Sequence, residues 1–400
     1  MDSPLLGGPS NLEPVSSRGL LRDLAPERSV GRLTSDSDPG GVMKVHRAVL
    51  LLCLLSAALL ARAADYPTPR SGDFVVKDFQ FKSGERLGEV KLHYYTLGTP
   101  QKDASGKVRN AVLILHGTGG SGRQFLTPTF AGVLFGPGQL LDAAKYFLIL
   151  PDNVGHGDSS KPSDGLHMRF PHYEYDDMIE LQYRLLTQGL GVNHLRLVMG
   201  TSMGGMHTWL WAEQHSDFMD AAMPLASQPI EIAGRNRMMR RMVLDAIRTS
   251  PDWNNGEYTQ QPHGLAAALD VLLLMGGSPL QMQKQQPTRE KADDFLENYV
   301  ATRSKTTDAN DLLYYFDASR NYNPEPQLDK ITVPLTAVNS ADDQINPPEL
   351  KIIDADIRRV KQGKYVLLPI TDATRGHGTH SLPAIWGDQL KELLERSAPQ

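Results

Sequence analysis

Apolar residues along this chain gather in short runs that alternate with longer stretches of helical spacing, the pattern of an α/β protein. Two runs with alternating polar positions, 73–81 and 89–97, predict the opening strands on either side of a Ser83-Gly84 turn. Further strands are predicted by apolar runs at 110–115, 145–150, 195–199, 333–338 and 365–370. Helices are predicted at 176–190, 206–212, 238–247, 264–275 and 292–301.

A serine stands between one such strand and one such helix. The segment Gly200-Thr201-Ser202-Met203-Gly204 fits the pattern G-x-S-x-G and separates the run 195–199 from the helix 206–212. Strand, sharp turn and helix together form a nucleophile elbow, in which flanking glycines let the backbone bend and raise the serine hydroxyl above the sheet edge. The pattern alone also occurs by chance, as a tight turn without activity. Its context favours Ser202 as a nucleophile.

A serine nucleophile needs a histidine to accept its proton and a carboxylate to hold that histidine in the correct tautomer. In α/β-hydrolases these groups follow in the order Ser, Asp or Glu, His, so the partners are sought after Ser202. Asp342 and Asp343 lie in a loop directly after the predicted strand 333–338. The carboxyl ends of parallel strands carry the chemistry of such sheets. Either aspartate is therefore a candidate.

Two histidines near the end of the chain are candidates for the base. His377 has a glycine on each side and follows the predicted strand 365–370, and His380 is the alternative. His156 lies in a D-x-x-G-x-G-x-S loop that precedes Ser202. Because the order is then wrong for a triad, we interpret that loop as a structural turn. His377 is the predicted base.

A glycine-rich loop supplies candidates for an oxyanion hole. The strand 110–115 opens into Gly117-Thr118-Gly119-Gly120, whose backbone N–H groups can face a developing oxyanion. We assign the donors to the N–H groups of Thr118 and Met203. A phosphate cradle is the rival interpretation, but the sequence lacks G-x-x-x-x-G-K-[ST].

These motifs resemble the homoserine O-acetyltransferase family of α/β-hydrolases. The resemblance extends from about Asp73 to Leu394 and includes the segments 170–178, 200–206, 246–253, 343–348 and 376–377. It implies a mostly parallel eight-stranded sheet with helices on both faces, a helical lid and a homodimer through that lid. Family spacing places the triad aspartate four residues before the first of two prolines, which favours Asp343, and it also favours His377.

Two family positions differ in this sequence. Family members have an arginine two residues before the Ala-Ile pair, on the path to the homoserine carboxylate. They also have an aspartate directly after the catalytic histidine, which helps to hold the substrate's amino group. Here these positions are Leu244 and Gly378. A site without both charged contacts has little means of selecting a zwitterionic amino acid. We therefore expect hydrolysis of a small-molecule ester, with acyl transfer or a non-catalytic binding role as alternatives.

The N-terminal region predicts export. A basic segment at 43–47, an apolar run at 48–60 and the A-x-A sequence at 61–63 form a signal peptide over 43–63, with an uncleaved anchor as the alternative. Residues 1–42 are interpreted as disordered or as a mis-assigned start, with Met43 as the true start in place of Met1. Cys53, the only cysteine, lies in the apolar run. A secreted or periplasmic protein meets no acetyl-CoA, and hydrolysis needs only water.

Composition adds the remaining expectations. The formal net charge of −5 and the lack of a basic stretch with interleaved aromatic residues argue against nucleic-acid binding. No metal-ligand spacing is found, and no cofactor is predicted. The hydrolase core is assigned to 64–226 and 323–400, and the helical lid to 227–322. In the lid, Arg235, Arg237, Arg240 and Arg241 either meet an anionic substrate or form a solvated helix face.

Overall fold

The computed structural model describes residues 66–398. The predicted signal peptide at 43–63, the region 1–42 and Cys53 lie outside the described residues.

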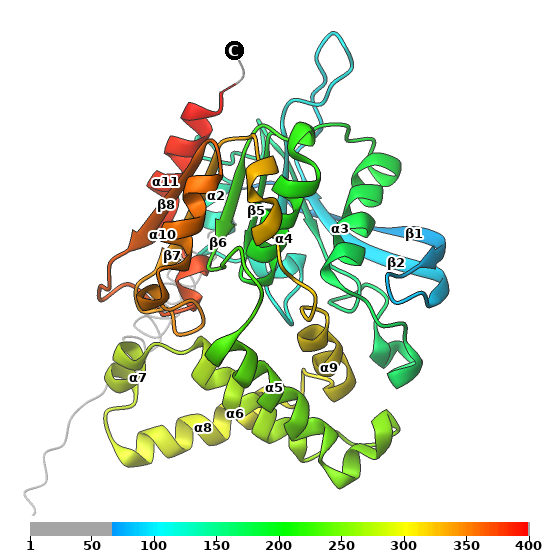
Figure 1. Ribbon diagram of the computed structural model, residues 1–400, viewed down its shortest axis with the longest axis vertical. Helices are drawn as coiled ribbons and strands as arrows, with labels where there is room; N and C mark the ends of the chain where they lie inside the picture. Colours follow the sequence, from blue (N-terminus) through cyan, green and yellow to red (C-terminus); the bar gives the residue numbers. More distant parts are fainter. Residues whose placement is uncertain (1–65, 399–400) are drawn as a thin grey trace, which may run out of the picture. The chain divides into compact units, whose positions relative to one another are not determined.

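An eight-stranded sheet lies at the centre of the described chain, with the strand order β1-β2-β4-β3-β5-β6-β7-β8 (Figure 1). Its strands are β1 (Arg70–Gln80), β2 (Arg86–Leu97), β3 (Ala111–Leu115), β4 (Phe147–Pro151), β5 (Leu197–Thr201), β6 (Ala222–Leu225), β7 (Leu335–Ser340) and β8 (Gly363–Leu368). The pairs β1–β2 and β2–β4 are antiparallel, and every other neighbouring pair is parallel. The predicted fold class, an α/β-hydrolase fold, is confirmed.

Helices cover both faces of this sheet because successive side chains of each central strand point to opposite sides. In β3, Leu113 joins a core with residues of α3 (Tyr175–Arg184) and α4 (Met203–Gln214). Its neighbour Ile114 joins a second core with residues of α2 (Ala131–Leu134) and α11 (Pro383–Arg396). Burial of each such large apolar side chain stabilises the fold by about 1.5–3 kcal/mol. The two cores hold the carboxyl ends of the strands in place.

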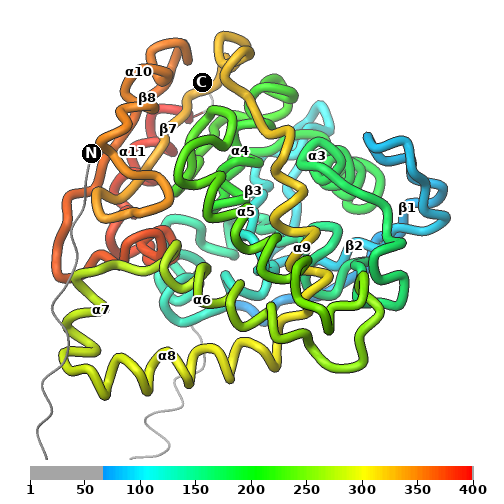
Figure 2. Tube along the Cα trace, turned by 60° about the horizontal axis from the view of Figure 1, so that its bottom comes forward, coloured from blue at the N-terminus to red at the C-terminus, as the bar shows by residue number. Residues whose placement is uncertain are grey.

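Five helices between β6 and β7 form the lid. They are α5 (Gly234–Arg248), α6 (Gly264–Gly276), α7 (Pro279–Gln285), α8 (Arg289–Arg303) and α9 (Ala309–Asp317). Helices α5, α6 and α9 share a small apolar core of their own. Figure 1 shows the lid below the carboxyl ends of the strands, and Figure 2 shows α8 running along it from α7 towards α9. The described residues form one compact unit, so the lid packs on the sheet domain.

Several elements differ from the prediction. The nucleophile strand runs over Leu197–Thr201, two residues later than predicted, because Gly200 and Thr201 still pair with β3 and β6. The helix predicted at 176–190 ends as an α-helix at Arg184 and continues as a short π-helix over Leu185–Gly189. The elements β6, α7, α9 and α11 were not predicted.

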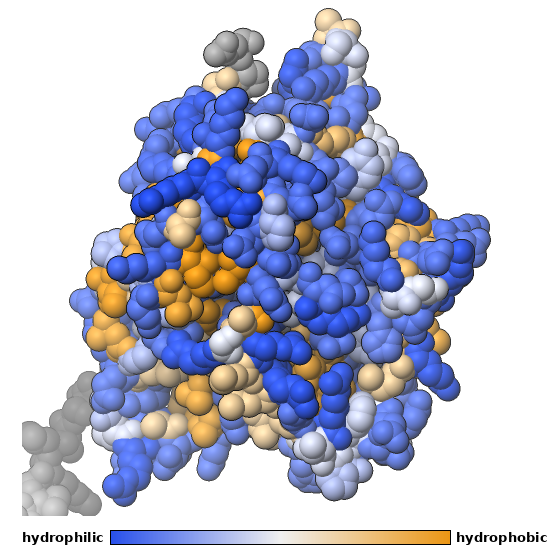
Figure 3. Space-filling model, in the orientation of Figure 1, coloured by the Kyte–Doolittle hydropathy of each residue, from blue (hydrophilic) through white to orange (hydrophobic). Residues whose placement is uncertain are grey.

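The surface drawn in Figure 3 is mainly hydrophilic, with hydrophobic side chains gathered over β6 and β7. Among residues 66–398, no single helix has the length and hydropathy to cross a membrane. Helices α6 and α7 pass that test only as a pair bent by 108°.

Candidate active site

Ser202 sits on a strained turn between β5 and α4. Its backbone has φ 58° and ψ −114°, a conformation that L-residues rarely adopt. The turn is so tight that a Cβ on Gly204 would lie 1.9 Å from the carbonyl oxygen of Leu115. A Cβ on Gly200 would lie 2.1 Å from the carbonyl oxygen of Gly204. Both glycines of the G-x-S-x-G motif are therefore needed, as a nucleophile elbow requires.

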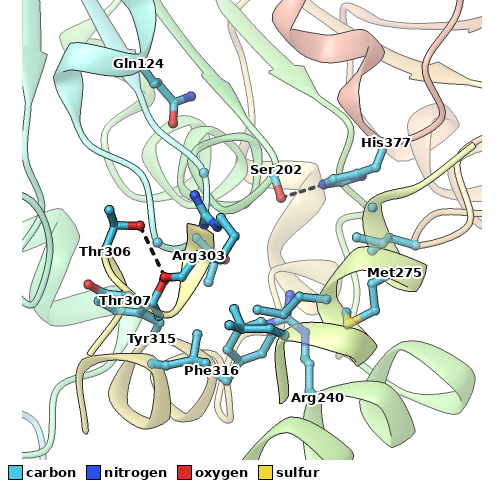
Figure 4. A pocket seen from close by; sticks show the side chains of 18 of the residues that line it. Gln124, Ser202, Arg240, Met275, Arg303, Thr306, Thr307, Tyr315, Phe316 and His377 are labelled. Carbon is cyan, nitrogen blue, oxygen red and sulfur yellow. Dashed lines mark hydrogen bonds between the residues drawn. The ribbon is translucent and has the colours of Figure 1, made fainter. Parts of the chain in front are cut away.

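The structure brings Ser202, His377 and Asp343 together in one hydrogen-bonded chain. His377 Nε2 lies 2.7 Å from Ser202 Oγ (Figure 4), and His377 Nδ1 lies 2.8 Å from Asp343 Oδ2. The histidine loop follows β8 and the aspartate loop follows β7, so the three side chains meet at the carboxyl edge of the sheet. This is the arrangement in which a histidine takes a serine proton and a carboxylate stabilises the resulting imidazolium.

Asp343 is held as a buried carboxylate. Its side chain is 0% exposed, and it accepts hydrogen bonds from the backbone N–H groups of Ile345 and Asn346 and from Asn346 Nδ2. Burial by itself raises the pKa of Asp343, but the nearby His377 and these hydrogen bonds outweigh it and leave the pKa below its ordinary value. Asp343 is thus ionised and oriented towards His377 Nδ1.

Asp342, the alternative aspartate, has a different set of partners. Its Oδ1 accepts from Ser340 Oγ, and its Oδ2 accepts from the N–H of Gly376 at 2.9 Å and from Ser278 Oγ at 3.1 Å. Ser278 precedes α7 of the lid, and Gly376 precedes His377. Asp342 therefore ties the lid to the histidine loop.

The other two histidines considered for catalysis do not reach Ser202 by a hydrogen bond. The rings of His380 and His377 are 5.2 Å apart, and burial lowers the pKa of His380 to about 3. His156 is buried, its Nδ1 donates to the carbonyl oxygen of Val154 at 3.1 Å, and its ring stacks on Tyr315 with 4.0 Å between ring centroids. Burial holds the pKa of His156 well below its ordinary value. Both rings are neutral packing elements next to the site.

Two backbone N–H groups next to Ser202 lack an acceptor in the part of the chain that the structure describes. Met203 is the first residue of α4, where a helix leaves its N–H free. Thr118 follows Gly117, and a Cβ on Gly117 would lie 3.4 Å from Ser202 Cβ, so this loop touches the nucleophile. The predicted oxyanion donors, Thr118 and Met203, are both placed beside Ser202.

A cavity of about 440 Å³ opens between these residues and the lid. Ser202 and His377 form one side, and Arg240, Met275 and Phe316 form the opposite side (Figure 4). The sequence grouped Arg240 with three neighbouring arginines and did not single it out. Its spacing from Val243, Leu244 and Ile247, which are buried on the same helix face, is the signal that would have done so. Among residues 66–398, no group of three or more potential metal-ligating side chains is found.

Comparison with known proteins agrees with the fold. A family model described as "alpha/beta hydrolase fold" matches residues 110–368. Over 281 residues, the chain is 26% identical to a protein named "Probable acyltransferase" from Methanothermobacter thermautotrophicus, covering 70% of this chain and 85% of that one. It is 29% identical to a homoserine O-acetyltransferase from Pelobacter propionicus, covering 74% and 87% of the two chains. A match to the homoserine O-acetyltransferase of Methanohalophilus mahii covers 60% of that protein.

Solved structures with the same fold include both esterases and acetyltransferases. The crystal structure of esterase E22 aligns with a TM-score of 0.72 and 20% identity, covering 82% of this chain and all of the other. The homoserine O-acetyltransferase from Bacillus anthracis aligns with the same score and identity, covering 84% of this chain and all of that one. The predicted resemblance is confirmed.

Proposed function

The chain belongs to the α/β-hydrolase fold family, and from this premise we propose that it is a serine hydrolase that cleaves small carboxylic esters through an acyl-enzyme on Ser202. The observation that carries the proposal is the hydrogen-bonded chain Ser202–His377–Asp343, beside two backbone N–H groups with no acceptor among the described residues. An acyl-enzyme serves both reactions, because it can be released by water or by another acceptor.

The geometry suits a two-step reaction. Ser202 Oγ bonds to the ester carbonyl carbon while its proton passes to His377 Nε2, and the N–H groups of Thr118 and Met203 stabilise the oxyanion. The alcohol leaves with the proton from His377. A water molecule then gives a proton to His377 and attacks the acyl-enzyme. Collapse of the second oxyanion returns the proton to Ser202 and releases the carboxylic acid.

Hydrolysis of 4-nitrophenyl acetate by wild type, Ser202→Ala and His377→Ala tests this proposal. We expect each variant to lose at least roughly a thousandfold in kcat. His380→Ala is the matched control for the histidine, because its ring lies in the same loop without a hydrogen bond to Ser202. No turnover in the wild type, or full turnover in Ser202→Ala, would contradict the proposal and favour a non-catalytic binding role.

Acyl transfer is the second candidate, and the acetyltransferase relatives favour it. Two positions argue against homoserine as the acceptor. Leu244 is buried in the apolar core of the lid, and Gly378 has no side chain to bind an amino group. A product whose formation depends on an added alcohol, at the expense of acetate, would identify transfer. With water as the acceptor, acetate is the expected product.

We also propose export, on the basis of the signal-peptide pattern at 43–63. Cell fractionation followed by N-terminal sequencing tests it. A mature N-terminus at Ala64 outside the cytoplasm is the expected result. A cytoplasmic protein that retains residues 43–63 would contradict it.

A further inference from the structure

Arg240 is a buried cation without a counter-ion. Arg240 is 4% exposed. Its Nε donates to Asn236 Oδ1 at 3.0 Å, and its Nη1 donates to Ser319 Oγ at 3.1 Å. The guanidinium lies 5.3 Å from the ring centroid of Phe316. These partners are all neutral. Among residues 66–398, no carboxylate lies within 4.0 Å of this guanidinium.

The titratable neighbour of Arg240 does not supply a negative charge by ionising either. Tyr175 is a titratable neighbour of Arg240, and burial raises its pKa, so its hydroxyl stays neutral. Burial lowers the pKa of Arg240, yet a guanidinium remains protonated in proteins. Buried charges in proteins are normally paired, because a charge loses its hydration when it leaves water. An unpaired one needs a functional explanation.

The neighbouring arginine shows the ordinary alternative. Arg241, the next residue of α5, is 64% exposed at its side chain and forms an ion pair with Asp245 at 2.7 Å. Arg240 instead turns into the cavity that contains Ser202 and faces the nucleophile from the lid side (Figure 4). Helix α5 thus presents Arg241 to solvent with a carboxylate partner, and it presents Arg240 to the active site without one.

The hydrogen bonds that Arg240 already makes leave a specific set of donors. A guanidinium has five N–H groups, and the bonds to Asn236 and Ser319 use one on Nε and one on Nη1. One N–H on Nη1 and both on Nη2 remain. Guanidinium N–H groups suit the oxygens of a carboxylate, and a charged acceptor would take up donors that have no partner among the described residues. A single positive charge balances one negative charge, so a monoanionic carboxylate fits better than a phosphate dianion.

We infer that Arg240 binds a carboxylate on the ester substrate, so that the enzyme selects esters whose acyl or alcohol part carries a carboxylate over neutral esters of equal size. This inference rests on the proposed esterase function and adds the substrate class. The lid supplies this contact, and the sheet domain supplies the catalytic groups.

Two matched pairs of esters test the inference and locate the carboxylate. For the acyl part, 4-nitrophenyl hydrogen glutarate is compared with 4-nitrophenyl 5-methylhexanoate, in which an isopropyl group replaces the carboxylate. For the alcohol part, 4-acetoxybenzoate is compared in the same way with 4-isopropylphenyl acetate. The measured quantity is the ratio of kcat/KM for the charged ester to that for the neutral ester. A ratio taken within one protein cancels any loss of correctly folded enzyme.

In wild type we expect the ratio to exceed one for at least one pair. Arg240→Met, which keeps most of the side-chain volume, should lower that ratio roughly 10- to 100-fold, the value of hydrogen bonds to a charged group. Arg240→Lys keeps the charge without the paired donors, so its ratio should lie between those of wild type and Arg240→Met. Arg241→Met is the control on the same helix and should leave the ratio unchanged. An unchanged ratio in Arg240→Met for both pairs, or an equal fall in Arg241→Met, would overturn the inference.

Binding provides a readout that does not depend on turnover. Calorimetric titration of Ser202→Ala with monomethyl glutarate is compared with dimethyl glutarate, and then repeated in Ser202→Ala/Arg240→Met. We expect tighter binding of the monoanion, lost in the double variant. Such binding without hydrolysis by wild type would refute the proposed function and keep the carboxylate site. Hydrolysis without any preference for the monoanion would refute the carboxylate site alone.

Discussion

Replacing Asp343 by Asn exchanges one oxygen for an NH2 group in a buried carboxylate that accepts four hydrogen bonds. The amide oxygen can still accept from the backbone N–H groups of Ile345 and Asn346. The new NH2 group then faces Asn346 Nδ2 and His377 Nδ1, both of which donate in the wild type. His377 can relieve this conflict only by moving its proton from Nδ1 to Nε2. Nε2 would then donate to Ser202 Oγ and could not accept the serine proton.

The size of this effect follows from the tautomer. The same exchange in a serine-protease triad costs about ten-thousandfold in kcat, which corresponds to about 5.4 kcal/mol of transition-state stabilisation. Stability should fall far less, because only the bond to Asn346 Nδ2 is lost and the bond to His377 is kept with its direction reversed. We expect a decrease of about 1–3 kcal/mol in the free energy of unfolding.

Asp342→Asn is the matched comparison, one residue away and also buried. It weakens the contacts to Gly376 and Ser278 that tie the histidine loop to the lid, and we expect roughly a tenfold loss of kcat. Initial rates on 4-nitrophenyl acetate and urea unfolding of both variants supply the numbers. A loss in Asp342→Asn as large as in Asp343→Asn, or a loss in Asp343→Asn below tenfold, would refute the assignment of Asp343.

Three further predictions concern the oxyanion loop, the elbow and a buried acid. Thr118→Ala keeps the backbone donor and should change kcat less than about threefold. Thr118→Pro removes that donor and should lower kcat about a hundredfold or more. Equal losses of kcat in steady-state assays would argue against this donor. Gly204→Ala places a Cβ 1.9 Å from the carbonyl oxygen of Leu115 and should destabilise the fold by about 3 kcal/mol in urea unfolding, while Gly132→Ala, with nothing within 4 Å, should not. Burial raises the pKa of Asp311 to about 7, so the folded state holds a proton that the unfolded state has released, and stability falls as pH rises from about 4 to 7. Asp311→Asn should flatten this part of the melting-temperature profile between pH 4 and 8; an unchanged slope would contradict the raised pKa.

Much of the fold was predictable because the central strands are short apolar runs that end in glycine-rich or polar loops. The run 195–199 and the motif after it located the elbow, although the strand itself extends to Thr201. The strand β6 was missed because it has only four residues and includes Pro224, so it has neither the length nor the composition of a typical strand. The helix α9 was missed although Asp308 caps it by accepting from Asn310 N and Asp311 N. That capping aspartate was the available signal.

The site was predictable where a motif fixed the position and unpredictable where only packing did. Order along the chain limited the choice to Asp342 or Asp343 and to His377 or His380, and the family resemblance selected Asp343 and His377. The structure places those two in the hydrogen-bonded chain. The contact between Arg240 and the cavity depends on how α5 lies over Ser202. That arrangement depends on the packing of α5 against α6 and α9, which a sequence motif does not encode.

Covalent labelling tests the central claim most directly. The protein is treated with diethyl 4-nitrophenyl phosphate, digested and analysed by mass spectrometry, beside Ser202→Ala and His377→Ala. The account predicts a single diethylphosphoryl group on Ser202 in wild type, slow labelling in His377→Ala and none at this peptide in Ser202→Ala. Failure of the wild type to react, or a label on another residue, would contradict Ser202 as the nucleophile.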